Sequence, residues 1–139
     1  MSMRRAIPVG VIMVLALAAS QAEAARLRYA RPNAQGGVTA GTVSGYSGAR
    51  GSMVRGRSVT TNGAGGATAV SGMAVHGAQG GYGARAGTTT VGADGSVTHR
   101  SGLSATSAQG STVQSSGSAT RNADGTVSQS RTTNATNAV

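Results

Sequence analysis

A short internal repeat constrains this sequence more than any other feature. The triplet Ala-x-Gly occurs seven times, and successive alanines are separated by 15, 15, 14, 15, 15 and 15 residues. Asn, Gly or Ser precedes each alanine, and these residues favour turns. The second residue after each glycine is mostly a β-former. We therefore predict a series of turn-and-strand units, in which the turn glycines are Gly36, Gly51, Gly66, Gly80, Gly95, Gly110 and Gly125.

The last unit has the expected turn in its clearest form. Asn122-Ala123-Asp124-Gly125 has the residue preferences of a type I turn, and a left-handed glycine after such a turn forms the bulge of a tight hairpin. A β-prone run follows the glycine. Further glycines in the middle of several units predict a second break, which would divide each of these units into two short arms. These glycines are Gly72, Gly87, Gly102 and Gly117.

Two ordered architectures fit units of this length. Either each unit forms one coil of a β-solenoid, or successive units form an antiparallel meander or cross-β stack. The composition also favours disorder, because the 115 residues after Ala24 contain only 13 Leu, Ile and Val residues and such chains bury little apolar surface. The predicted fold class is therefore all-β and repetitive, as a solenoid or a meander, with substantial disorder.

The N-terminal segment has the pattern of a secretory signal peptide. Two arginines precede an apolar run over residues 6–19, and Ala22-Glu23-Ala24 fits the rule for signal cleavage. The apolar run of about 14 residues is shorter than the roughly 20 that a spanning helix needs. We predict a helical signal peptide at 1–24 and export of the mature chain to the periplasm, cell surface or medium, with no transmembrane span after cleavage.

The remainder of the chain is predicted to be one repetitive region. Residues 25–32 form a short basic lead with three arginines, residues 33–137 hold the seven repeats, and residues 138–139 are a C-terminal stub. The repeats are richer in glycine before residue 93 and richer in Ser, Thr and Asn after it. No composition boundary is sharp enough to separate two domains.

The residue types exclude most catalytic and metal chemistry. The chain has no cysteine, and Asp94 and Asp124 are the only acidic residues after the signal peptide, too few for a calcium cage. His76 and His99 have no Cys or Glu beside them. The glycine-rich stretch 77–83 lacks the lysine of a phosphate-binding loop. We therefore predict a protein without enzymatic activity, metal site or cofactor.

Positive charge is the one feature that indicates a partner. The formal net charge is +9, and five arginines lie seven to nine residues into their units, so stacked units would align them in a basic stripe. Such a stripe would bind anionic polysaccharide or lipopolysaccharide, or extracellular nucleic acid without sequence preference, because the tyrosines are too few to stack on bases. Alternatively, the charges keep a β-surface soluble and block its edges. The candidate residues are Arg55, Arg57, Arg85, Arg100 and Arg131.

The order of these features resembles that of a known group of proteins. A signal peptide followed by short Gly, Ala, Ser, Thr and Asn units, with stretches such as residues 116–125, resembles small exported tandem-repeat proteins of Gram-negative bacteria. The composition is similar to that of curli-type amyloid subunits, which implies self-assembly into oligomers or surface fibres. We expect an exported, non-enzymatic structural or adhesive repeat protein of the bacterial envelope. The alternative is a cationic module that binds anionic envelope polymers.

Overall fold

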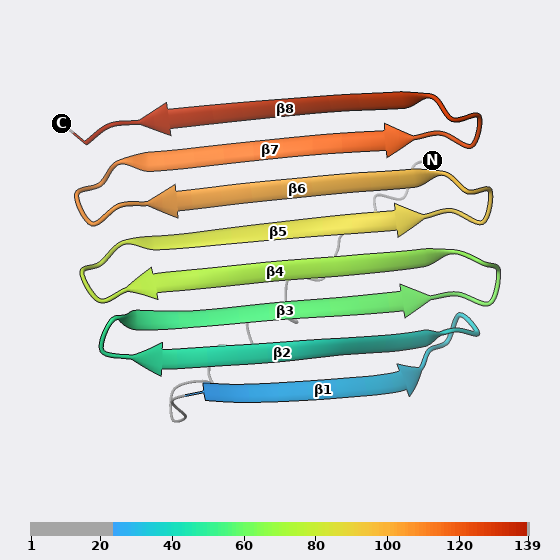
Figure 1. Ribbon diagram of the computed structural model, residues 1–139, viewed down its shortest axis with the longest axis horizontal. Helices are drawn as coiled ribbons and strands as arrows, with labels where there is room; N and C mark the ends of the chain where they lie inside the picture. The colour runs from blue at the N-terminus through green and yellow to red at the C-terminus, as the bar shows by residue number, and fades with distance from the viewer. Residues whose placement is uncertain (1–23, 139) are drawn as a thin grey trace, which may run out of the picture.

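The computed structural model describes residues 24–138, which form one sheet of eight antiparallel strands (Figure 1). The strands are β1 (Ala24–Pro32), β2 (Val38–Gly48), β3 (Gly51–Thr61), β4 (Ala67–Gly77), β5 (Tyr82–Val91), β6 (Val97–Thr106), β7 (Thr112–Arg121) and β8 (Val127–Thr136). Their order in the sheet is their order in the chain, so β1 and β8 are the two edges. The antiparallel meander is therefore the correct alternative, and the β-solenoid is wrong.

The hairpin loops are the physical reason for this outcome. At the last loop, the amide of Asn122 donates to the carbonyl of Thr126 at 2.8 Å, and the amide of Gly125 donates to the carbonyl of Asn122 at 3.0 Å. This is the predicted type I turn completed by a left-handed glycine, whose φ is 87°. The same two bonds close the loops that begin at Asn33, Gly77, Gly92 and Ser107. Such loops reverse the chain, whereas the parallel strands of a solenoid need longer crossovers.

The turn between β2 and β3 is shorter than the other loops. Gly48 pairs with Gly51, so only two residues connect these strands. The single 14-residue step lies elsewhere, between Ala64 and Ala78, because Ala64 is the third residue of its loop and Ala78 is the second. Of the seven predicted turn glycines, six have a positive φ: Gly36, Gly51, Gly80, Gly95, Gly110 and Gly125. In the remaining loop, which begins at Asn62, the left-handed residue is Gly65 (φ 86°). Gly66 closes that loop instead, because its carbonyl accepts the amide of Asn62 at 3.0 Å.

The glycines in the middle of the units do not break the strands. Gly72, Gly87, Gly102 and Gly117 lie at central positions of β4 to β7, and each pairs with a residue on both neighbouring strands. None of the four has a positive φ. Because two neighbouring strands hold the backbone extended at these positions, the predicted second break is wrong, and each unit contributes one continuous strand.

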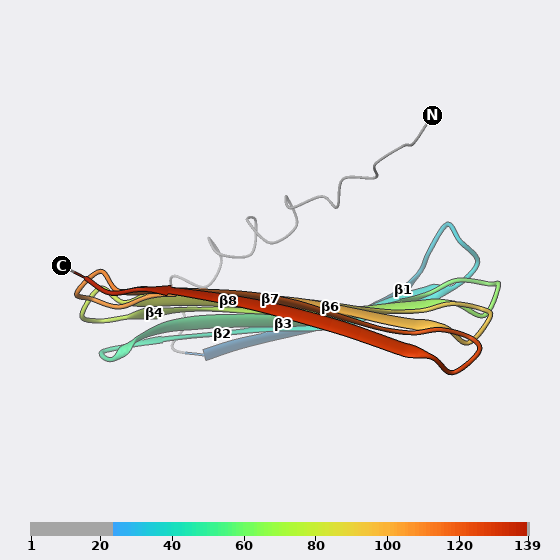
Figure 2. The same cartoon turned by 90° about the horizontal axis from the view of Figure 1, so that it is seen from above.

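Residues 24–138 form a single layer, and no other described element covers either face (Figure 2). Among the described residues, no apolar side chain is buried, and the one buried polar side chain is that of Ser115. Large apolar side chains are exposed instead, including Leu27 at 57% and Val127 at 67%. The sheet is therefore held together by its backbone hydrogen bonds and by cross-strand side-chain pairs, not by a core.

A row of threonines illustrates this cross-strand pairing. Six threonines align across β2 to β7, each paired with the next: Thr39, Thr60, Thr68, Thr90, Thr98 and Thr120. The hydroxyls of Thr39 and Thr60 form a hydrogen bond of 3.2 Å. Paired threonines stabilise adjacent strands, and side-chain ladders of this kind are typical of flat sheets.

The structure describes some of the segments that the sequence predicts. Residues 25–32, predicted as a basic lead, belong to β1 and pair with β2 along their whole length. Residues 24–138 are strands joined by short connections, so the structure does not confirm the predicted substantial disorder. Of the signal helix predicted at 1–24, residues 1–23 lie outside the described residues, and Ala24 begins β1.

Candidate anion-binding face

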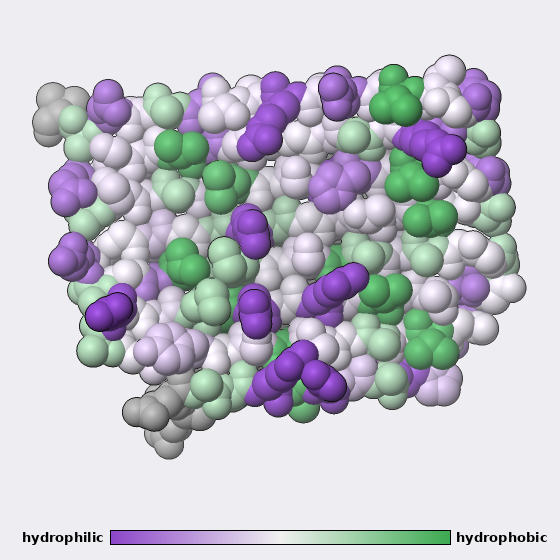
Figure 3. Space-filling model, in the orientation of Figure 1, coloured by the Kyte–Doolittle hydropathy of each residue, from purple (hydrophilic) through white to green (hydrophobic). Residues whose placement is uncertain are grey.

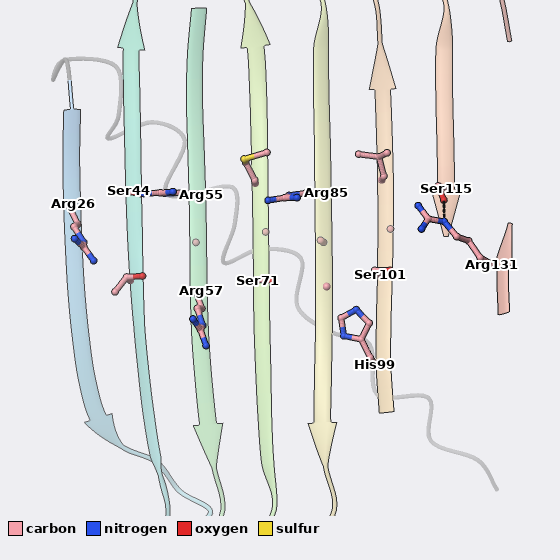
Figure 4. Close-up of a pocket in the computed structure, with 18 residues that line it drawn as sticks. Arg26, Ser44, Arg55, Arg57, Ser71, Arg85, His99, Ser101, Ser115 and Arg131 are labelled. Carbon is pink, nitrogen blue, oxygen red and sulfur yellow. Dashed lines mark hydrogen bonds between the residues drawn. The ribbon is translucent and has the colours of Figure 1, made fainter. Parts of the chain in front are cut away.

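The strand register separates the arginines into two sets. Alternate residues of a strand point to opposite faces of the sheet, and directly paired residues share a face. Arg55 pairs with Met73, and Met73 pairs with Arg85, so these two arginines lie on one face. We call it the arginine face (Figure 4), and its central members are Arg26, Arg28, Arg55, Arg57, Arg85 and Arg131.

The six side chains form two rows that cross the strands. The first row contains Arg26, Arg55 and Arg85, and the second contains Arg28, Arg57 and Arg131. Strands lie about 4.8 Å apart, so arginines on alternate strands are about 10 Å apart along a row, whereas Arg131 on β8 lies about 24 Å beyond Arg57 on β3. The rows are two residues apart on each strand, which is about 7 Å. Together they form a positive band, and Figure 3 shows strongly hydrophilic residues over the middle of this face.

Serine hydroxyls beside two of these arginines orient the guanidinium groups. Nε of Arg55 donates to Oγ of Ser44 at 3.0 Å, and Nε of Arg131 donates to Oγ of Ser115 at 3.2 Å. The hydroxyl of Ser115 also bonds to that of Thr133 at 2.9 Å. Because these bonds use only the Nε donors, the terminal guanidinium nitrogens are available for the oxygens of an anion.

No acidic side chain shares the arginine face within residues 24–138. Asp94 and Asp124 lie in hairpin loops, beyond the ends of the strands. Each carboxylate accepts a hydroxyl bond of 2.6 Å and an amide bond of 2.9 Å, from Ser96 and from Thr126 respectively. The hydroxyl bond is the largest cause of the lowered pKa of each aspartate, and the amide bond adds to it. The aspartates therefore stabilise loops and do not neutralise the arginine face.

Apolar side chains flank the arginine rows on both sides of the same face (Figure 3). Val91 pairs with Val97 near one end of the strands, and Met53 pairs with Val75 near the other. A shallow depression between these margins is lined by five of the six arginines, all except Arg28, and by small residues such as Gly87. The charged band is therefore narrow along the strands and long across them, a shape that suits a linear ligand.

Four of the five candidate arginines predicted from the sequence lie on this face: Arg55, Arg57, Arg85 and Arg131. Arg100 lies on the opposite face, because it pairs with Thr88 and Ser118. The prediction of a single stripe is therefore corrected at this residue. Its physical reason is the strand register: Arg85 pairs with Leu103, and Arg100 lies three residues from Leu103 on β6, an odd separation that places it on the opposite face.

Arg26 and Arg28 complete the two rows, although the sequence predicts only that they belong to the basic lead. A sequence signal for them exists. The pair Arg26-x-Arg28 precedes the pair Arg55-x-Arg57 by 29 residues, which is close to two units. The loops that begin at Asn33 and Asn62 are also 29 residues apart, so the two pairs stand at equal distances before these loops and share a face.

The two histidines lie on opposite faces of the sheet. His99 is on the arginine face, where its Nδ1 and the hydroxyl of Thr89 form a hydrogen bond of 2.8 Å. His76 pairs with Ser52 and Tyr82 on the other face. In the part of the chain that the structure describes, no three His, Cys, Asp or Glu side chains lie close enough to hold a metal ion. The lack of enzymatic activity stays a prediction.

Comparisons with known proteins give no match to a family model, to a curated protein or to a solved structure. Within residues 24–138, no helix has the length and apolar character needed to cross a membrane. The candidate function therefore depends on the geometry and charge of the sheet.

Proposed function

We propose that this chain is an exported, non-enzymatic repeat protein of the bacterial envelope that adheres to anionic polymers through its arginine face. The observation that carries the proposal is the alignment of six arginines in two rows, with no acidic side chain on the same face among the described residues. Its ligand class is a linear polyanion, such as an acidic polysaccharide or lipopolysaccharide.

The side chains on this face favour recognition of charge over recognition of sequence. Arginine binds carboxylate, sulfate and phosphate oxygens through two parallel hydrogen bonds. Of the three tyrosines in the described chain, only Tyr46 shares the arginine face, since Tyr29 and Tyr82 lie on the other face. Because stacking on bases needs several aromatic side chains, we expect nucleic acid to bind without sequence preference.

The salt dependence of binding tests this proposal directly. Heparin is a suitable probe, because it is a linear polyanion of high charge. If all six arginines contact it, the logarithm of the binding constant falls with the logarithm of salt concentration with a slope of roughly −4 to −5. Binding that does not depend on salt, or no binding at low salt, would overturn the proposal.

A pair of double variants with equal net charge separates the arginine face from general basicity. Arg55→Gln with Arg57→Gln removes two charges from the arginine face. Arg31→Gln with Arg100→Gln removes two charges from the opposite face. We expect the first pair to reduce the salt slope by about 2 and the second pair by less than about 1. Equal effects would mean that net charge alone attracts the polymer.

A structural role as a self-assembling fibre is the second candidate, and the β8 edge favours it. Every residue of β8 is exposed, and Arg131 is its single charged residue, so this edge presents unpaired backbone groups to another strand. The β1 edge carries three arginines and ends at Pro32, features that block edge pairing. Fibre diffraction of concentrated protein tests this candidate, and it fails if the reflection of about 4.8 Å expected for cross-β stacking is absent.

A further inference from the structure

We propose that the face opposite the arginine face packs against the same face of a second copy of the chain, which gives a symmetric two-layer sandwich. We call it the reverse face. Its apolar patch consists of Leu27, Tyr29, Val43, Val54 and Val70, which lie on β1 to β4. Three of these side chains are strongly exposed, with Leu27 at 57%, Val70 at 42% and Tyr29 at 38%.

A row of glycines crosses the middle of this patch. Gly56 pairs with Gly72, Gly72 pairs with Ala86, and Ala86 pairs with Gly102. The space above the row is open, because a Cβ placed on Gly72 would meet nothing closer than the carbonyl oxygen of Arg85 at 3.6 Å. The row forms the floor of a shallow apolar groove between Val43, Val54 and Val70. Side chains of a second layer would fit into such a groove.

The need for a second layer follows from the absence of a core among the described residues. An isolated sheet gains little from the hydrophobic effect, which is the dominant favourable contribution to folding. Two sheets that pack face to face bury their inner side chains in a shared core about 10 Å thick. The apolar patch supplies these inner side chains on each copy.

The charges identify which faces meet. The arginine face carries the six central arginines and also Arg121, whose partner Val97 lies on that face, so two arginine faces would repel each other. The reverse face carries Arg31 at the end of β1 and Arg100 on β6, both at the margins of the apolar patch. Contact between two reverse faces therefore buries the apolar patch and leaves the seven arginines of the arginine face in solvent, together with apolar side chains beside them such as Val91 and Leu103.

The part of the reverse face that carries the patch is large enough for a stable pair, counting the threonine row beside the patch. Five strands at about 4.8 Å spacing, each ten residues long at about 3.4 Å per residue, cover roughly 800 Å². A standard interface buries about 800 Å² on each partner. The reverse face over β1 to β5 alone meets this requirement, and the more polar part over β6 to β8 can remain at the rim.

Growth through the sheet edges is less favourable than this face-to-face pairing. If β1 of a second copy continued the register beyond β8, Arg28 would lie in the same row as Arg131, and like charges on neighbouring strands destabilise a sheet. A face-to-face pair has no such contact and is closed by its symmetry. It would also present two arginine faces on opposite sides, so that one pair can bridge two polymer chains.

The reactivity of single introduced cysteines tests the proposal, because the chain has no cysteine of its own that would also react. Ala74→Cys places a thiol on the reverse face, and Ser71→Cys places one on the arginine face of the same strand. Both positions are exposed in the single chain. In the full chain at high concentration, we expect a maleimide to label Ala74→Cys about tenfold more slowly than Ser71→Cys, with the difference lost on dilution. Sedimentation should give the mass of two chains over the same concentration range.

A matched pair of charge insertions gives a second, independent measurement. Val70→Asp on the reverse face and Val91→Asp on the arginine face replace valines of similar exposure, 42% and 37%. We expect Val70→Asp to shift the chain to monomer and Val91→Asp to leave the dimer intact. If Val70→Asp fails to fold, the labelling comparison still decides the question.

Three results would overturn the proposal. A monomer at all concentrations with equal labelling at both cysteines would show that nothing covers the reverse face. A monomer with protected Ala74→Cys would show that another part of the same chain covers it. Association with freely reactive Ala74→Cys would show that copies meet at their edges. Heparin binding reports on the arginine face alone, so this proposal and the proposed function can fail separately.

Discussion

The arginine face and the reverse face are made from the same eight strands, yet their chemistry differs. On β3, Arg55 and Arg57 point to the arginine face, whereas Val54, Gly56 and Ser58 point to the reverse face. In most sheets this alternation separates core from solvent. Because this sheet has no core among its described residues, the alternation instead creates two surfaces, one that carries most of the arginines and one with few charges and an apolar patch on β1 to β4. A single layer can thus offer two different partners one surface each.

The largest expected effect comes from removing a whole arginine row. The triple variant Arg26→Gln, Arg55→Gln and Arg85→Gln should weaken heparin binding at low salt by roughly 100- to 1,000-fold, because each lost contact no longer releases counterions. Calorimetric titration measures the affinity, and circular dichroism confirms that the β content is retained. Unchanged affinity in a folded triple variant would contradict the assignment of the arginine face.

A smaller effect is expected when one charge is moved between the faces. The double variant Ala84→Arg with Arg85→Ala keeps the composition but transfers an arginine to the reverse face, because neighbouring residues point to opposite sides. We expect about tenfold weaker heparin binding and a weaker face-to-face pair, measured by titration and sedimentation. If binding and association both equal those of the wild type, the two faces are not distinct surfaces.

The difference between the arginine face and the reverse face also shows which features could be predicted from the sequence. The turn glycines and the strand type were predictable, because turn preference and β propensity are local properties of the residues. The face of each arginine was not, because it depends on register, and a shift of one residue exchanges the faces. Arg85 and Arg100 occupy equivalent positions in consecutive units, yet Arg85 pairs with Leu103.

The sequence alone also could not predict that the mid-unit glycines leave the strands unbroken. Gly72 and Gly87 look like turn residues when each is considered alone. In the sheet they lie between two paired strands, and the ladder of backbone hydrogen bonds outweighs their preference for turns. The meander itself had a sequence signal in the type I turn with its following glycine, which belongs to hairpins.

Alanine substitutions at two glycines in different environments provide a third test. One is Gly51, which follows the turn as the first residue of β3, and the other is Gly87, in the middle of β5. Gly51 has a φ of 128°, and a Cβ there would overlap the carbonyl oxygen of His76. Gly51→Ala should therefore destabilise the sheet by about 1–3 kcal/mol. At Gly87 the nearest atom to an added Cβ is Cε1 of His99 at 3.5 Å, so Gly87→Ala should stabilise by about 0.5–1 kcal/mol. Urea denaturation measures both, and a destabilising Gly87→Ala would contradict the extended backbone at that position.

The smallest expected effect is a local response to acid. The pKa values of Asp94 and Asp124 are lowered in the folded chain, so their loop bonds stabilise the fold at pH values above the ordinary aspartate range, which is about 4. This stabilisation should be lost as the pH falls below that range and through the lowered pKa values. Amide exchange at Ser96 and Thr126 should then accelerate.

Two loops of the same sheet provide the control for this acid response. Asn33 and Asn62 make equivalent bonds to the amides of Gly37 and Gly66 through side chains that do not titrate. Exchange at these two amides should not follow the same pH dependence. If all four loops respond alike, the acid effect is global and the carboxylates are not its cause.

The antiparallel meander is the basis of both faces, and a pair of spin-label distances tests it most directly. Labels at Ala93 and Ala108 occupy equivalent positions in consecutive units, but they lie in loops at opposite ends of β6. The meander predicts about 35 Å between them, the length of a ten-residue strand, and about 10 Å between Ala93 and Ala123, which are two strands apart at the same end. A distance of about 5 Å between Ala93 and Ala108 would show parallel stacking of units and would contradict the assignment of both faces.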